Sequence, residues 1–380
     1  MLLVVLAATP FVWAHFAISR TDWDLSRARQ SLSSPTTATS VPASGRRGGT
    51  LSPPQTVWPA LTTSTTVSSA AASEHVLSED LVVLLAGSDS RPGFGGSRAD
   101  VIMVVVAPAD SDEVRIVSIP RDLVVEVPCW GYTRINSALN GCPSKGVSGL
   151  ELLAVTVEDW AGIEIDHVAS TSFGGFVQAV DLLGGYEVCL KFPVRDRDAH
   201  LDLPAGCQTL DGEDTLALVR SRKTQELRGG RWRSVGASDF SRMARQRDVA
   251  AQLARRVTSV SSLPALTQVV AAVAQHVTVD EGWSVPEMAA DLWAIRGRRI
   301  GGASLQGRSY INSRGMWVIE ASESFDDAFR RADPNTSTAT SASSSSTSTT
   351  LPTTSTTAPT TPSTVSTTST TVLRPALPVE

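Results

Sequence analysis

The sequence has few of the residues from which common catalytic and metal sites are built. Among its 380 residues are 5 His and 4 Cys. They form no CxxC pair and no cluster at zinc-ligand spacing, so a zinc site is not expected. No Walker loop, GxGxxG fingerprint, HExxH helix or Ser-His-Asp order is present. These absences exclude the familiar nucleotide-binding, zinc-hydrolase and triad-hydrolase classes.

An excess of positive charge is also absent, because the net charge is −5, and no nucleic-acid partner is expected. The basic residues are nevertheless concentrated in one region. Between Glu213 and Arg256, eleven basic residues stand against five acidic ones. This patch is either a solvated helical face or the binding site of a localised anionic ligand.

No Lys or Arg precedes the apolar run at the N-terminus, so the usual positive-inside signal is missing. Residues 1–19 are long enough for a membrane anchor and lack a clean cleavage site, which favours an uncleaved anchor over a signal segment. We therefore expect a single-pass protein of the cell membrane whose folded part faces the extracytoplasmic side. Cleavage of the segment would make the protein secreted.

The number of cysteines is consistent with export, because an even number in an exported chain suggests that they form disulfides. They are Cys129, Cys142, Cys189 and Cys207. Four cysteines allow three connectivities. Pairing between sequence neighbours would pin two loops, and free buried thiols are the alternative.

Ser, Thr and Pro dominate two stretches that have too few apolar residues to fold, 31–73 and 334–380. We expect a disordered linker and a disordered tail there. The residues between them, 75–333, are enough for one large domain or two small ones. We divide them into a main part, 75–260, and a helical and β extension of the same globular unit, 261–333.

Apolar runs and helix-capping signals alternate along this folded part. The apolar runs predict strands at residues 80–87, 100–107, 113–119, 123–127, 163–170, 186–190, 299–305 and 316–320. The capping signals and helical periodicity predict helices at residues 148–160, 176–183, 211–220, 238–257, 264–275 and 284–295. This mixture predicts a layered α/β fold.

Charged residues stand at the ends of several predicted elements. Asp89 follows one strand and Asp100 begins the next, with a glycine-rich loop and Arg98 between them. Two carboxylates on adjacent strand rims can share a Mg²⁺ ion whose other positions are filled by phosphate and water. The alternative is an ordinary polar hairpin loop. Arg121, in a Pro-Arg-Asp break between apolar runs, offers a planar fork that suits phosphate, although such a residue is often part of an exposed turn.

A second group of polar and charged residues lies within the basic region between Glu213 and Arg256. Arg220 and Arg222 follow an apolar helical segment and converge only if that helix ends there. In the next helix Asp239, Arg242 and Gln246 share a narrow polar sector beside an apolar stripe. Polar groups beside a buried face need partners. The partner is either an anion bound near the N-terminus of the helix or, within the first turn, an ion pair between Asp239 and Arg242. A site rich in Arg and Asp, without an evident nucleophile, suits phosphoryl transfer.

Nine short motifs in a fixed order resemble the LytR–CpsA–Psr family over residues 80–257. They are residues 84–90 (LLAGSDS), 97–103 (SRADVIM), 118–122 (SIPRD), 134–138 (RINSA), 165–167 (IDH), 176–185 (FVQAVDLLGG), 210–213 (LDGE), 219–222 (VRSR) and 239–246 (DFSRMARQ). The cysteine-containing stretch 204–212 (PAGCQTLDG) is similar to that of actinobacterial members.

This resemblance implies a membrane-anchored, exported enzyme with an α/β/α sandwich, a central mixed β-sheet and a hydrophobic pocket for a polyprenyl tail. It implies that Asp89 and Asp100 hold Mg²⁺, with Mn²⁺ as a substitute, and that Asp239 orients the arginines. The residues that it implies for phosphate binding are Arg98, Arg121, Arg220, Arg222, Arg242 and Gln246. All of these except Gln246, together with Asp239, form the implied catalytic set.

The implied reaction transfers a glycan 1-phosphate from a polyprenyl-pyrophosphate carrier to a peptidoglycan hydroxyl, with pyrophosphatase activity as a side reaction. The implied partners are the lipid-linked donor, peptidoglycan and the cytoplasmic membrane. Two features depart from the family pattern. Arg134 stands where the family usually has Lys, and residues 224–236 are an arginine-rich insertion that would form a lid or an acceptor-binding loop.

Two rival interpretations remain at this point. One is a noncatalytic protein that binds the carrier lipid in the same pocket. The other is a transcription regulator, which the apolar N-terminus, the cysteines and the lack of a helix-turn-helix disfavour.

Overall fold

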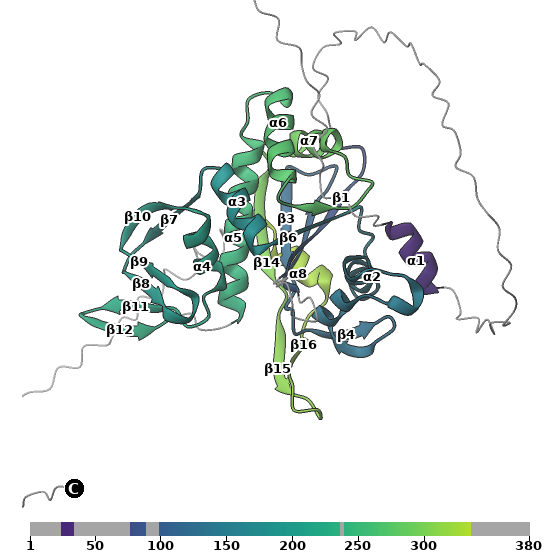
Figure 1. Ribbon diagram of the computed structural model, residues 1–380, viewed down its shortest axis with the longest axis horizontal. Coiled ribbons are helices and arrows are strands. Elements are labelled where there is room, and N and C mark those ends of the chain that lie inside the picture. The colour runs from purple at the N-terminus through teal and green to yellow at the C-terminus, as the bar shows by residue number, and fades with distance from the viewer. Residues whose placement is uncertain (1–23, 34–76, 89–98, 236–238, 336–380) are drawn as a thin grey trace, which may run out of the picture.

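A six-stranded mixed sheet forms the centre of the computed structural model, which describes residues 24–33, 77–88, 99–235 and 239–335 (Figure 1). The strand order is β13-β6-β1-β2-β3-β14. Strand β1 pairs in parallel with β6, β3 pairs in parallel with β14, and the other neighbours are antiparallel. The strands are β1 (Leu81–Ser88), β2 (Ala99–Ala107), β3 (Glu113–Ser118), β6 (His167–Ser172), β13 (Thr278–Val279) and β14 (Arg299–Ser304).

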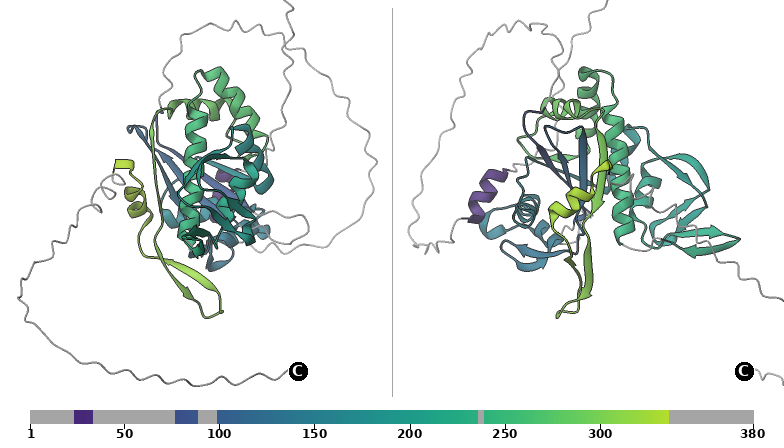
Figure 2. Two further views of the ribbon diagram at one scale, coloured as in Figure 1. Left: turned by 90° about the vertical axis from the view of Figure 1, so that its left-hand side faces the viewer. Right: turned by 180° about the vertical axis from the view of Figure 1, so that it is seen from behind.

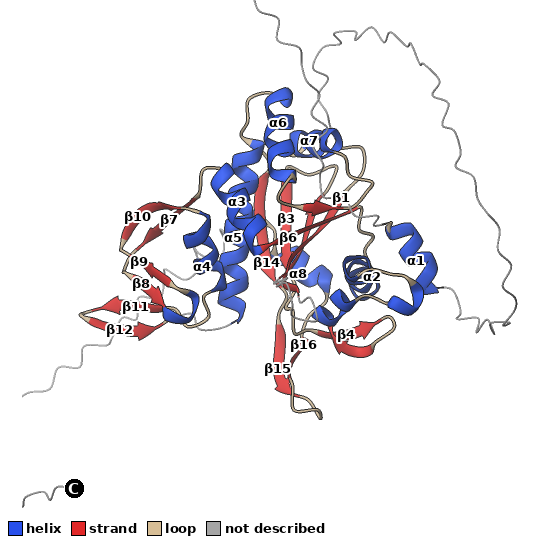
Figure 3. Cartoon of the chain, in the orientation of Figure 1, coloured by secondary structure: helices blue, strands red, loops and turns tan. Residues whose placement is uncertain are grey.

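Helices cover both faces of this sheet (Figures 2 and 3). The helices of the described residues are α1 (Leu25–Ser33), α2 (Gly149–Ala161), α3 (Phe173–Leu182), α4 (Gly212–Arg220), α5 (Asp239–Thr258), α6 (Leu263–Ala274), α7 (Val285–Ala294) and α8 (Phe325–Arg331). Among them, α4 packs against α3 and α5. Short 3₁₀ helices span Ile135–Asn140, Pro143–Lys145 and Arg197–Ala199.

Side chains alternate between the two faces because successive residues of a strand point to opposite sides. On β1, Leu84 and Ala86 pack into the core that also contains residues of α1, α2 and α8. Val83 points to the opposite face and packs with α6 and α7. Helix α5 covers β2 and β3 on that second face through Ala251, which packs with Met103 and Ile116. The expected α/β fold with a central mixed sheet is therefore confirmed, whereas the hydrophobic lipid-binding pocket stays a prediction.

A smaller lobe projects from α4 and has its own apolar core of Val194, Leu201, Leu203, Leu210, Ala217 and Leu218 (Figure 1). Its strands are β7 (Tyr186–Leu190), β8 (Val194–Asp196), β9 (Leu201–Leu203), β10 (Gly206–Leu210), β11 (Gln225–Arg228) and β12 (Arg231–Ser234). The arginine-rich insertion forms the β11–β12 hairpin and joins a four-stranded sheet, so it is an ordered part of this lobe.

Two further hairpins lie below the sheet in Figure 1. One pairs β4 (Val124–Val127) with β5 (Gly131–Arg134), and the other pairs β15 (Gly307–Ile311) with β16 (Trp317–Ala321).

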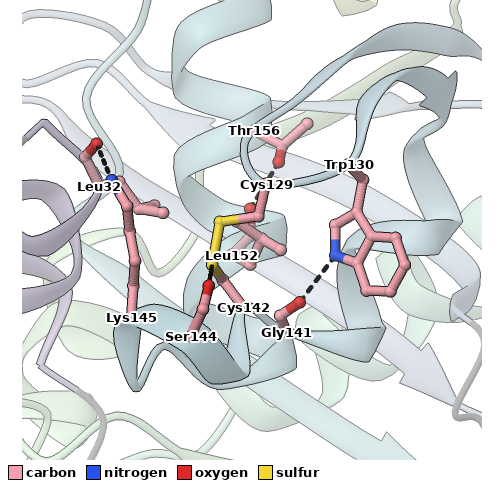
Figure 4. Close-up of a disulfide and its surroundings, with 9 residues drawn as sticks. All are labelled: Leu32, Cys129, Trp130, Gly141, Cys142, Ser144, Lys145, Leu152 and Thr156. Atoms are coloured by element: carbon pink, nitrogen blue, oxygen red, sulfur yellow. Dashed lines mark hydrogen bonds between the residues drawn. A yellow bond between two sulfur atoms is a disulfide. The ribbon is translucent and has the colours of Figure 1, made fainter. Parts of the chain in front are cut away.

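Both disulfides join sequence neighbours. Cys129 pairs with Cys142, and Cys189 pairs with Cys207 across the directly opposed residues of β7 and β10. The first closes the loop that follows β4 and lies against α2 (Figure 4). The indole of Trp130 donates to the carbonyl of Gly141 at 2.8 Å in the same loop, so two cross-links hold this region.

The folded part extends slightly beyond the predicted boundaries. The linker was expected to begin at residue 31, but α1 continues to Ser33 because tertiary contacts hold it: Arg29 pairs with Glu158, and Lys145 donates to the carbonyl of Leu32 at 2.8 Å. The tail was expected from residue 334, but Asn335 donates to Glu113 Oε1 at 2.6 Å. Residues 1–19, 34–73 and 336–380 of the predicted anchor, linker and tail lie outside the described residues. Within the described ranges, no helix combines the length and the apolar character that a bilayer crossing requires.

Candidate functional site

Arg121 and Asp100 meet at one end of the central sheet. Asp100 lies in β2, and Arg121 follows β3, which is the neighbouring strand. The chain stays beside β2 after β3 ends, because Ile119 N donates to the carbonyl of Ile102 at 2.9 Å, and it then turns where Leu123 N donates to the carbonyl of Pro120 at 3.0 Å. The guanidinium of Arg121 pairs with Asp100 Oδ1. Burial alone would lower the pKa of Arg121, but Asp100 and Asp122 outweigh it and raise that pKa.

Arg242 and Asp239 occupy the first turn of α5 and form an ion pair of 2.5 Å between Arg242 Nη2 and Asp239 Oδ1. The Arg242 side chain is only 3% exposed. Its burial is the largest cause that lowers its pKa to about 10, and the nearby cations Arg222 and Arg121 lower it further, while Asp239 acts in the opposite direction. The buried guanidinium of Arg242 therefore lies near those of half-buried Arg121 and exposed Arg222, and the three groups repel one another.

Three buried polar atoms of this cluster have no hydrogen-bond partner among the residues that the structure describes. They are Arg121 Nε, Arg242 Nε and Asp239 Oδ2. Arg121 Nε lies 3.4 Å from Asp122 Oδ2 and forms an ion pair with it, but the pair lacks hydrogen-bond geometry. Buried polar groups are rarely left unpaired, since an unpaired group costs about 1–3 kcal/mol. Two free donors and one free acceptor in a cationic cluster are therefore suited to a phosphate-containing ligand.

Arg222 is placed by a buried carboxylate that the sequence analysis did not single out. Asp196 Oδ2 accepts hydrogen bonds from Arg222 N at 2.9 Å, Lys223 N at 2.7 Å and Ser221 Oγ at 2.7 Å. Burial would raise the pKa of Asp196, but these hydrogen bonds lower it overall. The charged sequence Arg195–Asp198 is typical of an exposed turn, and only the fold reveals that Asp196 is just 2% exposed.

Helix α5 also fixes the end of α4. Gln246 Nε2 donates to the carbonyl of Val219 at 3.2 Å, and Arg245 donates to the carbonyls of Leu218, at 3.3 Å, and Ser221. Because α4 ends at Arg220, these carbonyls lack the usual i+4 amide partner, although that of Leu218 also accepts from Ser221 N at 3.3 Å. The described contact of Gln246 is thus with the backbone that leads to Arg222, and its contact with phosphate stays a prediction.

The predicted site residues are only partly brought together. Asp100, Arg121, Arg222, Asp239 and Arg242 form one cluster, as their mutual electrostatic effects show. Arg220 lies instead with its guanidinium over the ring of Phe173, at 4.6 Å from the centroid. The expectation that α4 ends at this point is correct. Asp89 and Arg98 lie outside the described residues.

The cluster can supply part of a magnesium site. Within the described ranges no group of three or more His, Cys, Asp or Glu side chains is positioned to hold a metal ion. Mg²⁺ does not need such a group, since one or two carboxylates suffice when phosphate oxygens and water complete the octahedron. Asp100 uses Oδ1 for Arg121, which leaves Oδ2 to face a cation. The chemistry of Asp100 therefore fits the expected ion, provided that a phosphate ligand shares it.

Asp122 extends the cluster to a fourth cation. Its carboxylate lies 3.4 Å from Arg121 Nε and 3.1 Å from Arg134 Nη1. Arg134 ends β5 and so links this cluster to the β4–β5 hairpin. Four guanidinium groups stand against three carboxylates here, and this excess of positive charge favours an anion.

Comparison with known proteins gives concordant results. The LytR_cpsA_psr family is matched over residues 60–326, which continues past residue 260 and includes β14. "Probable cell wall biosynthesis protein LcpB" of Corynebacterium glutamicum is 36% identical over 235 residues, which cover 56% of this chain and 51% of that protein. "Polyisoprenyl-teichoic acid--peptidoglycan teichoic acid transferase TagT" of Bacillus subtilis is 30% identical over 208 residues, which cover 52% of this chain and 59% of that protein.

Solved structures agree at the level of the fold. The "LytR-Csp2A-Psr enzyme from Actinomyces oris" superposes with a TM-score of 0.51 at 26% sequence identity, and the superposition covers 66% of this chain and 89% of that one. The chain spans little more than half the length of the two curated relatives that it matches.

Proposed function

Because this chain belongs to the LytR–CpsA–Psr family, we propose that it transfers a phosphate-linked glycan from a polyprenyl-pyrophosphate carrier to a hydroxyl of peptidoglycan. The observation that carries this proposal is the set of three buried, unpartnered polar atoms on Arg121, Arg242 and Asp239. A diphosphate offers acceptors to both Nε donors, and the neighbouring hydroxyl offers a donor to Asp239 Oδ2. The names of the relatives, a teichoic acid transferase among them, support the same class of reaction.

The arginines bind and polarise the phosphates in this proposal. Arg121, Arg222 and Arg242 neutralise the charge that develops on the phosphoryl oxygens, and their fixed positions remove the need to reorganise water. The hydroxyl oxygen of the acceptor attacks the phosphorus that carries the glycan. The bond from this phosphorus to the bridging oxygen breaks, its electron pair leaves with polyprenyl phosphate, and the hydroxyl proton passes to a carboxylate or to water. Water in place of the acceptor would give the pyrophosphatase side reaction.

Asp100 and Asp89, the latter beyond the described residues, would hold magnesium, and the ion would supply additional neutralisation of phosphate charge. Asp239 has a separate task, since its Oδ1 holds Arg242 in place. The position of Asp100 beside Arg121 supports this metal site, because a cation held there would share the phosphate with the arginines.

The lipid tail is proposed to enter between the sheet and α5. On this side Leu85, Val101, Val105 and Ala250 are apolar but only partly buried. A polyprenyl chain would bury this surface further, and each buried CH₂ group contributes about 0.8 kcal/mol. The lipid-linked donor also requires the folded part to lie beside the outer face of the cytoplasmic membrane, and this location belongs to the proposal.

The test uses the full-length protein in detergent with a polyprenyl-pyrophosphate-linked glycan and peptidoglycan fragments. We expect Mg²⁺-dependent appearance of glycan on peptidoglycan together with an equal amount of polyprenyl phosphate, and loss of both on addition of EDTA. Arg121→Ala should abolish turnover, whereas Arg115→Ala, which removes an arginine from an ion-pair cluster at the other end of β3, should retain it. Tight donor binding without turnover by the wild type would instead identify a noncatalytic lipid-binding protein.

A further inference from the structure

A groove next to the arginine cluster is not used by the proposed phosphate chemistry. It has a volume of about 380 Å³ and lies between the β4–β5 and β15–β16 hairpins. Pockets for small ligands have volumes of about 300–1,000 Å³, so this one admits a short oligomer. Figure 1 and both views of Figure 2 show β15 and β16 projecting from the sheet as a long hairpin, and residues of this hairpin line one side of the groove.

The β15–β16 hairpin is anchored directly beside the phosphate-binding residues. Ile319 N of β16 donates to the carbonyl of Asp122 at 2.8 Å, and Ile319 also bridges to Leu123. On the opposite wall Arg134 both lines the groove and pairs with Asp122, the neighbour of Arg121. The groove therefore begins where the arginine cluster ends, and a ligand in it would lie next to the reacting phosphate.

The lining combines exposed aromatic rings with polar groups. Tyr132 is 63% exposed, although aromatic side chains are usually covered in a folded protein. It shares the groove with Tyr310, with Val124 and Met316, and with Arg134 and Arg314 at its edges. Flat aromatic faces, each carrying a hydroxyl, match pyranose rings, whose C–H faces are apolar and whose edges are polar. A lipid tail in the groove would leave the polar groups of the lining without hydrogen-bond partners, and free phosphate would make no use of the aromatic rings.

We propose that this groove is a saccharide subsite in which pyranose rings stack on Tyr132 and Tyr310 beside the phosphate. The inference rests on the proposed function, because it gives the groove to a glycan of the transfer reaction. Two glycans have the required chemistry, namely the peptidoglycan acceptor and the sugar nearest the donor phosphate. The arms of the test separate these two sources.

The first test measures binding of a soluble N-acetylglucosamine oligomer to the full-length protein by calorimetry, without any lipid-linked donor. Tyr132→Ala and Tyr310→Ala should each weaken binding about tenfold, and Tyr132→Phe and Tyr310→Phe, which keep the rings, should restore most of it. Trp317→Ala is the matched control, because Trp317 is an exposed aromatic residue of the same hairpin, at 65%, that does not line the groove. It should bind like the wild type.

The second test measures the kinetics of transfer. A rise in KM for the acceptor alone assigns the groove to peptidoglycan, and a rise in KM for the donor alone assigns it to the donor glycan. Either result supports the subsite, provided that kcat at saturation changes little. A wild-type protein that transfers glycan but shows no oligomer binding, with unchanged KM values in the tyrosine variants, overturns the subsite and leaves the proposed function intact. A wild type that transfers nothing defeats the proposed function instead.

Discussion

Arginines and carboxylates gather at both ends of strand β3, but their hydrogen bonds are complete at one end and incomplete at the other. At its beginning, Glu113 accepts from Arg115 at 3.0 Å, Arg299 at 2.9 Å and Asn335 at 2.6 Å. Beyond its other end, Arg121 joins a cluster in which three buried polar atoms find no partner in the described parts of the chain. Both regions combine arginines with carboxylates, so composition alone does not distinguish them.

This difference teaches how to separate a structural ion cluster from a binding site. A cluster whose hydrogen bonds are complete has nothing left to offer a ligand, and its residues contribute to stability. A cluster with leftover donors and an excess of like charge costs stability until a ligand completes it. We therefore expect substitutions at the two ends of β3 to have opposite effects on turnover and on stability.

Arg121→Ala should give the largest effect. Removal of a guanidinium that stabilises phosphoryl charge lowers kcat by about 10³-fold, whereas the melting temperature changes little because Asp100 and Asp122 remain partly hydrated. The measurement combines glycan-transfer rates with calorimetric melting of the same sample. If the folded variant kept the turnover of the wild type, the cluster that contains Arg121 would not be the phosphate site.

Glu113→Ala should show the reverse pattern. Its loss leaves the partly buried guanidinium of Arg115 without a main partner and costs about 3 kcal/mol of unfolding free energy, with transfer activity per folded molecule preserved. Urea unfolding gives the first quantity, and the transfer assay gives the second. A large loss of turnover with unchanged stability would assign catalytic importance to the wrong end of the strand.

Asp196→Asn tests the link between a complete hydrogen-bond network and the position of Arg222. An amide oxygen replaces the carboxylate poorly, so we expect a loss of about 2 kcal/mol in unfolding free energy and a moderate fall in kcat. Since the folded pKa is lowered, the contribution of Asp196 to stability is complete above its unfolded pKa of about 3.9 and is lost as the pH falls through the folded pKa. The urea midpoint of the wild type should therefore fall more steeply below pH 4 than that of the variant.

Arg242→Met should have the smallest effect on stability while it removes donor binding. The buried cation is repelled by Arg121 and Arg222, so an apolar side chain of similar length should leave the unfolding free energy unchanged or raise it by up to about 1 kcal/mol. The pKa of about 10 predicts that the wild type gains stability, relative to the variant, as the pH rises through that value. A strong destabilisation at pH 7 would show that Arg242 belongs with the structural clusters.

Much of the fold could be predicted from local patterns. The capping boxes at Ser148 and Ser284 begin α2 and α7 as expected, and the apolar runs give β1, β2 and β3 within one residue at each end. Local signals were sufficient there because capping residues or the ends of apolar runs mark the boundaries of these elements in the sequence. The helix α8 was missed even though Ser324 and Asp327 form a capping box, since Asp in place of Glu weakens the signal.

Elements that depend on distant contacts could not be predicted in this way. Helix α1 is polar and short, and contacts with α2 hold it through Glu151 and Glu158. The short strands β8, β9, β11 and β12 acquire their pairing from one another and lack strong apolar alternation. Among the candidate site residues, Asp100, Arg121, Arg222, Asp239 and Arg242 were predicted from charged motifs and form one cluster. Asp196 and Arg245 were not predicted, because they act on backbone groups whose positions only the tertiary structure reveals.

Strand β14, from the C-terminal part of the described chain, pairs in parallel with β3 and covers the edge of that strand. Until residues 299–304 are added, β3 has an open edge, and open edges invite pairing with other chains. The same segment leads into the β15–β16 hairpin, whose Ile319 N donates to the carbonyl of Asp122, the neighbour of Arg121. A polypeptide that ended between residues 247 and 298 would thus contain Arg121, Arg134, Arg222 and Arg242 and still lack the strand that covers the open edge of β3.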